Sequence, residues 1–241
     1  FRDLATMDVR ASFDGPYVLF CAAVTTASIL VIWGLARLFL KDKHIVGEFV
    51  QASYRSSAAI LGAAFIQNIY GTSGLSGLMI LGSVPLYNIF AVVILTLESP
   101  SQDARSGMGE KLVTSLKGIV TNPILLGIAA GFGWSLLRLP MPAMANKTLS
   151  SLAGMTSPLA LLAIGAGFKG RAALGYLKPT AVATGIKLIL LPAIFLPVAV
   201  RLGFVDQKLV ALMVMLGSVT TPAGYVMAKQ MGHEGTRGYI V

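Results

Sequence analysis

Long runs of apolar residues dominate this sequence, and each run is about as long as a helix that crosses a lipid bilayer. Such a helix needs about 20 largely apolar residues. The chain is 55% hydrophobic and 12% charged, whereas soluble domains carry about 25% charged residues and expose few large apolar patches. We therefore predict an all-α membrane protein with spans at residues 15–40, 49–69, 76–97, 112–137, 149–168, 177–200 and 208–230.

The net charge of +9 could indicate a nucleic-acid partner. Lysine and arginine are spread over the short connections between apolar runs instead of forming one basic face, so we expect no nucleic-acid binding. If successive connections alternate between the two sides of a membrane, one side holds eleven of these residues and the other five. The positive side is predicted to be cytoplasmic, which makes residues 100–111 a cytoplasmic linker.

Cofactor and enzyme chemistry find little support in the sequence. Cys21 is the only cysteine and the two histidines are far apart, so we expect no metal site and no cofactor. Gly71-Thr72-Ser73-Gly74 matches a nucleophile pattern of intramembrane serine proteases. That chemistry needs a base within hydrogen-bond reach, and His44 and His233 fall in connections predicted on the opposite side. We interpret the segment as a turn and the protein as a non-enzyme.

Two cations lie inside predicted spans. Arg55 is several residues inside the second span, and Lys187 is in the middle of the sixth. A cation at that depth costs at least about 2.5–3.5 kcal/mol on insertion scales. Each could bind a ligand. The structural alternatives are that Arg55 snorkels to the interface or pairs internally, and that Lys187 tethers helix-end carbonyl groups.

Buried carboxylates that could neutralise these cations are missing from the sequence. No Asp or Glu occurs between Glu110 and Asp206, and Glu48 is expected only at the mouth of its span. A positive interior is costly unless an anion enters it. The sequence therefore favours an anionic substrate and argues against a carboxylate-based sodium or proton site.

Thr220-Thr221-Pro222 is the clearest local signal in the last span. Proline removes a backbone donor and clashes with the preceding turn, so we predict a helix break there. The helix that restarts after the break would attract anions at its N-terminus, although a simple kink is the alternative. Ser56 and Ser57 offer hydroxyl groups at the matching place in the second span, but no proline enforces a break.

Several segments together resemble the auxin efflux carrier family. They are residues 49–62, Pro85-Leu86-Tyr87-Asn88, Asn122-Pro123-Ile124-Leu125 and Thr221-Pro222-Ala223. The resemblance implies a ten-helix fold of two inverted five-helix repeats, whose fourth and ninth helices are broken and cross near the midplane. It assigns residues 1–99 to the first repeat without its first helix, and residues 112–241 to the second repeat with its last helix cut. Matched repeats with broken helices are typical of transporter binding sites.

The family's members include plant auxin exporters and bacterial permeases for malate and related acids. The short central loop resembles the bacterial type, so we expect a multi-pass protein of a bacterial inner membrane. The sequence departs from the family at Ser57, where many relatives carry asparagine. The predicted substrate-binding residues are Arg55, Ser56, Ser57, Thr220, Thr221, Pro222 and Lys187.

The predicted function is alternating-access transport of a small organic anion such as malate, another carboxylate or an auxin-like weak acid. The expected partners are that anion and the lipid bilayer, and a homodimer is left open. One alternative is a sodium-coupled organic-anion symporter of related fold. Another is a membrane receptor or scaffold that transports nothing.

Overall fold

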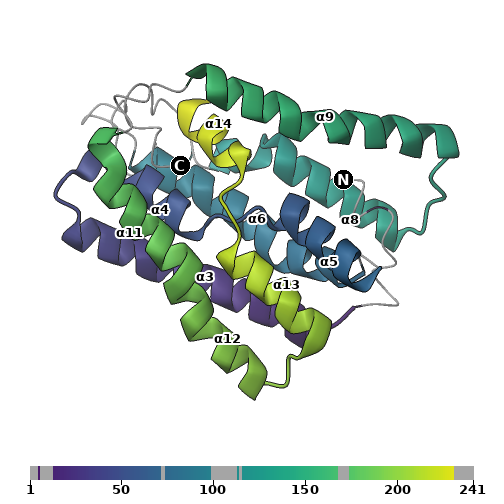
Figure 1. Ribbon diagram of the computed structural model, residues 1–241. Helices are drawn as coiled ribbons and strands as arrows, with labels where there is room; N and C mark the ends of the chain where they lie inside the picture. Colours follow the sequence, from purple (N-terminus) through teal and green to yellow (C-terminus); the bar gives the residue numbers. More distant parts are fainter. Residues whose placement is uncertain are drawn as a thin grey trace.

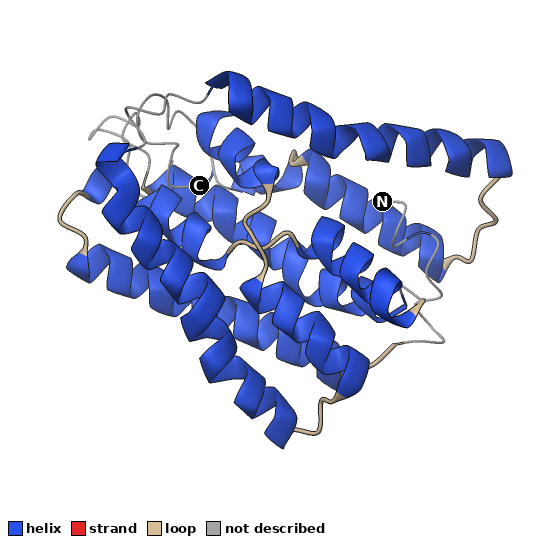
Figure 2. Ribbon diagram, in the orientation of Figure 1, coloured by secondary structure: helices blue, strands red, loops and turns tan. Residues whose placement is uncertain are grey.

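The computed structural model describes residues 13–71, 74–98, 116–167 and 174–230, together with the single residues 5 and 113. These parts are helical and contain no strand (Figure 2). The predicted linker, residues 100–111, and two residues of the rejected protease interpretation, Ser73 and His233, lie outside them. The prediction of an all-α protein is thus confirmed for the part of the chain that the structure describes.

The described helices are joined by short connections, and several pairs follow each other along one rod (Figure 1). In chain order they are α3 (Gly15–Phe39), η1 (Lys43–Ile45), α4 (Val46–Tyr54), η2 (Ala58–Gly62), α5 (Ala63–Tyr70), α6 (Gly74–Leu97), α8 (Pro123–Leu136), α9 (Ala143–Gly167), η3 (Leu174–Tyr176), α11 (Leu177–Gly185), η4 (Ile186–Leu190), α12 (Leu191–Arg201), α13 (Asp206–Gly217) and α14 (Pro222–Gln230).

Four of the described helices are long and apolar enough to cross a membrane, which indicates a membrane protein. They span Gly15–Phe39, Leu75–Leu97, Leu174–Arg201 and Asp206–Ala228. The remaining predicted spans are represented by α4 with α5, which are separated by a break, by the shorter apolar helix α8, and by α9, which has 25 residues.

Helices α3 and α6 pack closely because a glycine lies between them. A Cβ atom added to Gly82 would lie 2.7 Å from Cys21 Cβ and 2.8 Å from the carbonyl oxygen of Val18. Small residues commonly permit such close approach of helices in membranes. The free thiol of Cys21 and the ring of Tyr17 are completely buried in this contact region.

Two ion pairs fix the opposite ends of the bundle. At one end, Arg37 Nε lies 2.6 Å from Glu98 Oε1, which also accepts a hydrogen bond from Trp33 Nε1 at 2.7 Å. At the other end, Lys208 Nζ pairs with Asp14. The first pair joins the ends of α3 and α6, and the second joins the beginnings of α3 and α13. The two pairs thus connect α3 to α6 at one end and to α13 at the other.

We expect Asp14→Ala to weaken the junction between α3 and α13. Asp14 caps α3 by accepting a hydrogen bond from the Tyr17 N–H at 3.0 Å, and losing such a cap costs about 1 kcal/mol. The Lys208 ammonium, followed by the Tyr17 N–H, lowers the pKa of Asp14 below 3.8. Because the folded-state pKa is depressed, the charge contribution is complete above the unfolded value of 3.8 and is lost as the pH falls through the folded value.

Thermal unfolding of Asp14→Ala and Asp14→Asn in detergent, from pH 7 to pH 2.5, measures this effect. Asp14→Asn can retain the cap but lacks the charge. The difference between its melting temperature and that of the wild type should therefore shrink below about pH 4. A deficit that stays constant over the whole range would contradict the assigned role of the charge.

Candidate functional site

Two helical rods are interrupted, and the two interruptions cross each other. α4 ends at Tyr54, and Arg55 has an extended backbone with φ −70° and ψ 125°. α13 ends at Gly217, and Ser218 is also extended, with φ −85° and ψ 161°. In Figure 1 the connection between α13 and α14 passes over the one between α4 and α5.

Hydrogen bonds join the two interruptions directly. The Ser57 N–H donates to the Val219 carbonyl oxygen at 2.9 Å. The hydroxyl groups of Ser56 and Ser218 are hydrogen-bonded at 2.9 Å, although they are 162 residues apart in the chain. Each interruption thus satisfies polar groups of the other, as a non-helical backbone at membrane depth requires.

The sequence explains the two interruptions differently. Pro222 begins α14, the position at which its missing N–H and fixed φ are tolerated, and it disfavours helical geometry at Thr221. The first interruption has no proline. Serine competes with helical hydrogen bonds through its side chain, and the crossing supplies the Val219 carbonyl as a replacement acceptor for Ser57. The predicted break at 220–222 is present, and the one at 55–57, which was less certain from sequence, is present too.

Arg55 lies at the crossing with its side chain enclosed by protein. The residue is 2% exposed. Its Nη2 donates to Asn88 Oδ1 at 2.9 Å and its Nη1 to Gln51 Oε1 at 3.3 Å, whereas its Nε is buried without a hydrogen-bond acceptor. Asn88 is oriented by its own Nδ2, which donates to the Val84 carbonyl oxygen at 2.8 Å.

Lys187 reaches the same place from another helix. It is 2% exposed, and its Nζ donates to the carbonyl oxygen of Arg55 at 2.5 Å. Arg55 is the C-cap residue of α4, so the ammonium group occupies a helix C-terminus, where the helix dipole favours a positive charge. This geometry matches the tether that was one of the two interpretations of Lys187.

The two cations have no carboxylate partner within the described ranges. The ion pairs there join Arg37 to Glu98 and Lys208 to Asp14. Glu48 lies in the first turn of α4, at the start of its predicted span, and its side chain is completely buried. It is seven residues before Arg55, about 10 Å along a helix.

Two tyrosines connect the helices around Arg55. Tyr54 OH donates to the Tyr87 carbonyl oxygen at 3.2 Å, and Tyr87 OH donates to the Met215 carbonyl oxygen at 3.3 Å. The two ring centroids are 5.7 Å apart. These contacts hold α4, α6 and α13 together, so the position of Arg55 depends on packing among three helices.

A cavity of about 110 Å³ opens between the two interruptions. Four of the seven predicted site residues line it. The lining residues are Arg55, Ser56, Ser57, Ala59, Val84, Tyr87, Asn88, Thr221 and Ala223.

The other three predicted residues lie around the cavity. Thr220 is half-buried in the second interruption, Pro222 begins α14, and Lys187 contacts the backbone of Arg55. The structure therefore brings the predicted residues of both halves to one place, although only some face the cavity.

Several residues at the crossing were not predicted as site residues from the sequence. Asn88 was not among the predicted substrate-binding residues, and it accepts a hydrogen bond from Arg55 and lines the cavity. Its signal was an amide in the middle of an apolar run. Gln51 precedes Arg55 by four residues, a spacing that places two side chains on one helix face. Ser218 gave no signal, because its partner Ser56 is distant in the chain.

The groups at this cavity are of kinds that commonly bind anions in proteins. Arg55 supplies a positive charge and an N–H without an acceptor, and Ser57 and Thr221 contribute hydroxyl groups to the lining. α14 begins beside the cavity, and the N-terminus of a helix carries partial positive charge. Among the described residues, no group of three or more His, Cys, Asp or Glu side chains is placed to hold a metal ion.

Comparison with known proteins gives no independent assignment. Neither the models of protein families nor the curated proteins match this chain.

Proposed function

We propose that this protein is a secondary transporter of small organic anions that binds its substrate at the crossing of the two interrupted helices. The observation that carries the proposal is the enclosed Arg55 guanidinium, which lines a cavity and has no carboxylate partner in the described ranges. Burying a cation without an anion is unfavourable. A carboxylate in the cavity would supply the missing charge and an acceptor for the unpaired Nε.

The two crossing interruptions support transport over simple binding. Interrupted helices near the middle of a membrane are a recurrent feature of secondary transporters, because unwound backbone and half-helix ends can contact a substrate there. Here one interruption comes from each half of the chain. We propose that the halves are the inverted repeats of a ten-helix fold of the auxin efflux carrier type, with residues 100–111 as their linker.

The size of the cavity favours a small substrate. Its volume of about 110 Å³ is below the ~300–1,000 Å³ that is typical of sites for drug-sized ligands. The cavity suits a short mono- or dicarboxylate better than an acid with a large ring. Malate-like acids are therefore our first choice, and we place the protein in a bacterial inner membrane with its basic connections toward the cytoplasm.

Uptake by proteoliposomes tests the function. Purified protein should accumulate radiolabelled malate or malonate in a saturable manner, and the uncharged diamide of the same acid should neither enter nor compete, because it cannot neutralise Arg55. Protein-free liposomes control for leakage. If no carboxylate of a panel of C2 to C5 acids enters above this background, the transporter proposal is wrong.

The same assay separates the alternatives. A sodium-coupled symporter would require an inward sodium gradient for accumulation, whereas uptake driven by the anion gradient alone would persist in potassium or choline buffer. A receptor or scaffold would show no flux. A shift of the melting temperature by the acid without flux would favour the receptor.

A further inference from the structure

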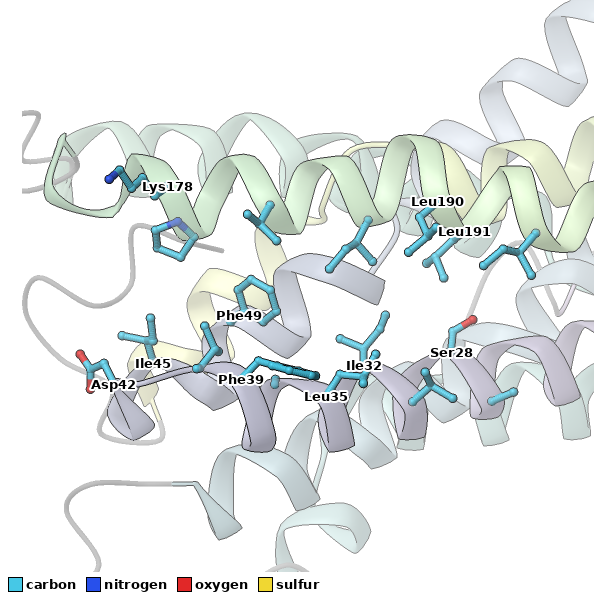
Figure 3. Close-up of a pocket in the computed structure, with 18 of the residues that line it drawn as sticks. Ser28, Ile32, Leu35, Phe39, Asp42, Ile45, Phe49, Lys178, Leu190 and Leu191 are labelled. Atoms are coloured by element: carbon cyan, nitrogen blue, oxygen red, sulfur yellow. The ribbon is translucent and has the colours of Figure 1, made fainter.

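A long apolar groove lies outside the cavity at the crossing and shares none of its lining residues. It runs between α3 on one side and α11, η4 and α12 on the other, with a volume of about 720 Å³. Figure 3 shows side chains of the two walls facing each other across this space, with Phe49 of α4 at its floor. Phe49 is 5% exposed, whereas Val31 and Val182 on the walls are 59% and 56% exposed.

The position of the groove identifies the medium that it opens to. Its walls belong to Gly15–Phe39 and Leu174–Arg201, two of the four helices of membrane-spanning length and composition. Within a bilayer, residues exposed on such helices face hydrocarbon or another membrane segment. The occupant of the groove must therefore come from the bilayer or from a protein segment inside it.

Ionic side chains gather at only one end of the groove. Lys41, Asp42 and Lys178 lie there, and apart from Ser28 every other lining residue is apolar. In Figure 3, Lys178 and Asp42 lie at the same end, and Ser28, Leu190 and Leu191 lie toward the other. The Asp42 carboxylate accepts a hydrogen bond from the His44 N–H at 3.0 Å, and Asp42, Lys41 and Lys178 are all exposed. This end therefore has a net positive charge.

We propose that this groove binds one anionic phospholipid, with an acyl chain along the apolar walls and the headgroup phosphate at Lys41 and Lys178. A molecule with a negative head and a long apolar chain matches a groove that is cationic at one end and apolar along its length. Lysines near the membrane surface attract anionic lipids, and both lysines lie on the side predicted to be cytoplasmic. The inference depends on the membrane location of the protein and not on its proposed transport activity.

Photolabelling of the reconstituted protein tests this proposal. Phosphatidylglycerol and phosphatidylcholine that carry a diazirine on the acyl chain are compared, and labelled peptides are mapped by mass spectrometry. Phosphatidylglycerol should label residues 27–40 and 179–195 well above the exposed apolar surface of α9, and above phosphatidylcholine by roughly tenfold, the scale expected for two lysines near an anionic headgroup.

Two pairs of variants test the binding of the lipid headgroup and of its acyl chain separately. Lys41→Gln with Lys178→Gln should abolish the preference for phosphatidylglycerol, whereas Lys117→Gln with Lys147→Gln, at exposed lysines outside the groove, should preserve it. Val182→Trp should fill the groove and reduce labelling by both lipids. Val200→Trp, at an exposed valine of α12 outside the groove, should not.

Three results would overturn the proposal. One is groove labelling no higher than that of α9, and another is equal labelling by the two lipids in the wild type. The third is cross-linking of a bifunctional reagent at position 182 to a second copy of the chain or to residues 231–241 in place of lipid. The melting temperature of each variant confirms that the protein is folded.

Discussion

Replacing Arg55 with methionine should abolish uptake of organic anions while leaving the protein folded. Arg55 is the charged group that lines the cavity at the crossing, and its Nε is buried without an acceptor. A hydrogen bond to a charged group contributes about 1.5–3 kcal/mol, and 1.4 kcal/mol corresponds to a factor of ten in binding. Loss of the hydrogen bond between Arg55 and the substrate carboxylate should therefore lower the substrate affinity by at least about tenfold.

The stability of Arg55→Met should change less than its activity, because two effects oppose each other. Removing a buried cation relieves a desolvation cost. The same change leaves Asn88 Oδ1 and Gln51 Oε1 without the donor they have in the wild type, at about 1–3 kcal/mol for each group left unsatisfied. A thermal melt in detergent, run beside the uptake assay, distinguishes loss of function from loss of folding.

Two further variants sharpen the test. Arg55→Lys keeps the charge but cannot reach Asn88 and Gln51 with one planar group, so we expect partial uptake. Arg201→Met, at an exposed arginine at the end of α12, removes the same charge without touching the crossing and should transport normally. Wild-type uptake by a folded Arg55→Met protein would remove the assigned site.

Replacing Lys187 with methionine should loosen the crossing. The Lys187 ammonium group donates to the carbonyl oxygen that ends α4, and an unsatisfied buried carbonyl costs about 1–3 kcal/mol. Two residues further along the chain, the Ser57 N–H donates to the Val219 carbonyl oxygen. We expect exchange of the Ser57 amide hydrogen to accelerate by about tenfold, the factor that corresponds to 1.4 kcal/mol.

Hydrogen–deuterium exchange of peptides that cover residues 55–58 and 218–221 measures this effect. Lys178→Met is the matched control, because Lys178 is an exposed lysine of α11 and lies away from the crossing. Unchanged exchange in Lys187→Met together with weakened anion binding would contradict the tether and assign Lys187 to the substrate instead.

The two interruptions differ in whether the residues next to them in the sequence predict a break. Pro222 predicts a break because its ring and missing N–H act within one turn of helix. The break at Arg55 has no such residue, and its Ser57 N–H is satisfied by a carbonyl group from the other half of the chain. A distant acceptor cannot be inferred from the residues on either side of a serine. The burial of Glu48 was missed for the same reason, since it depends on which helices cover α4.

The sequence by itself determined the helical class, the membrane location and the candidate cations at Arg55 and Lys187, because apolar length and charge content fix which segments lipid can accept. It also predicted the break before Pro222. Only the tertiary structure decided that the two interruptions cross, that Asn88 orients the guanidinium, and that Lys187 caps α4. These contacts join segments from 33 to 162 residues apart. Their geometry follows from the packing of whole helices, which no local pattern encodes.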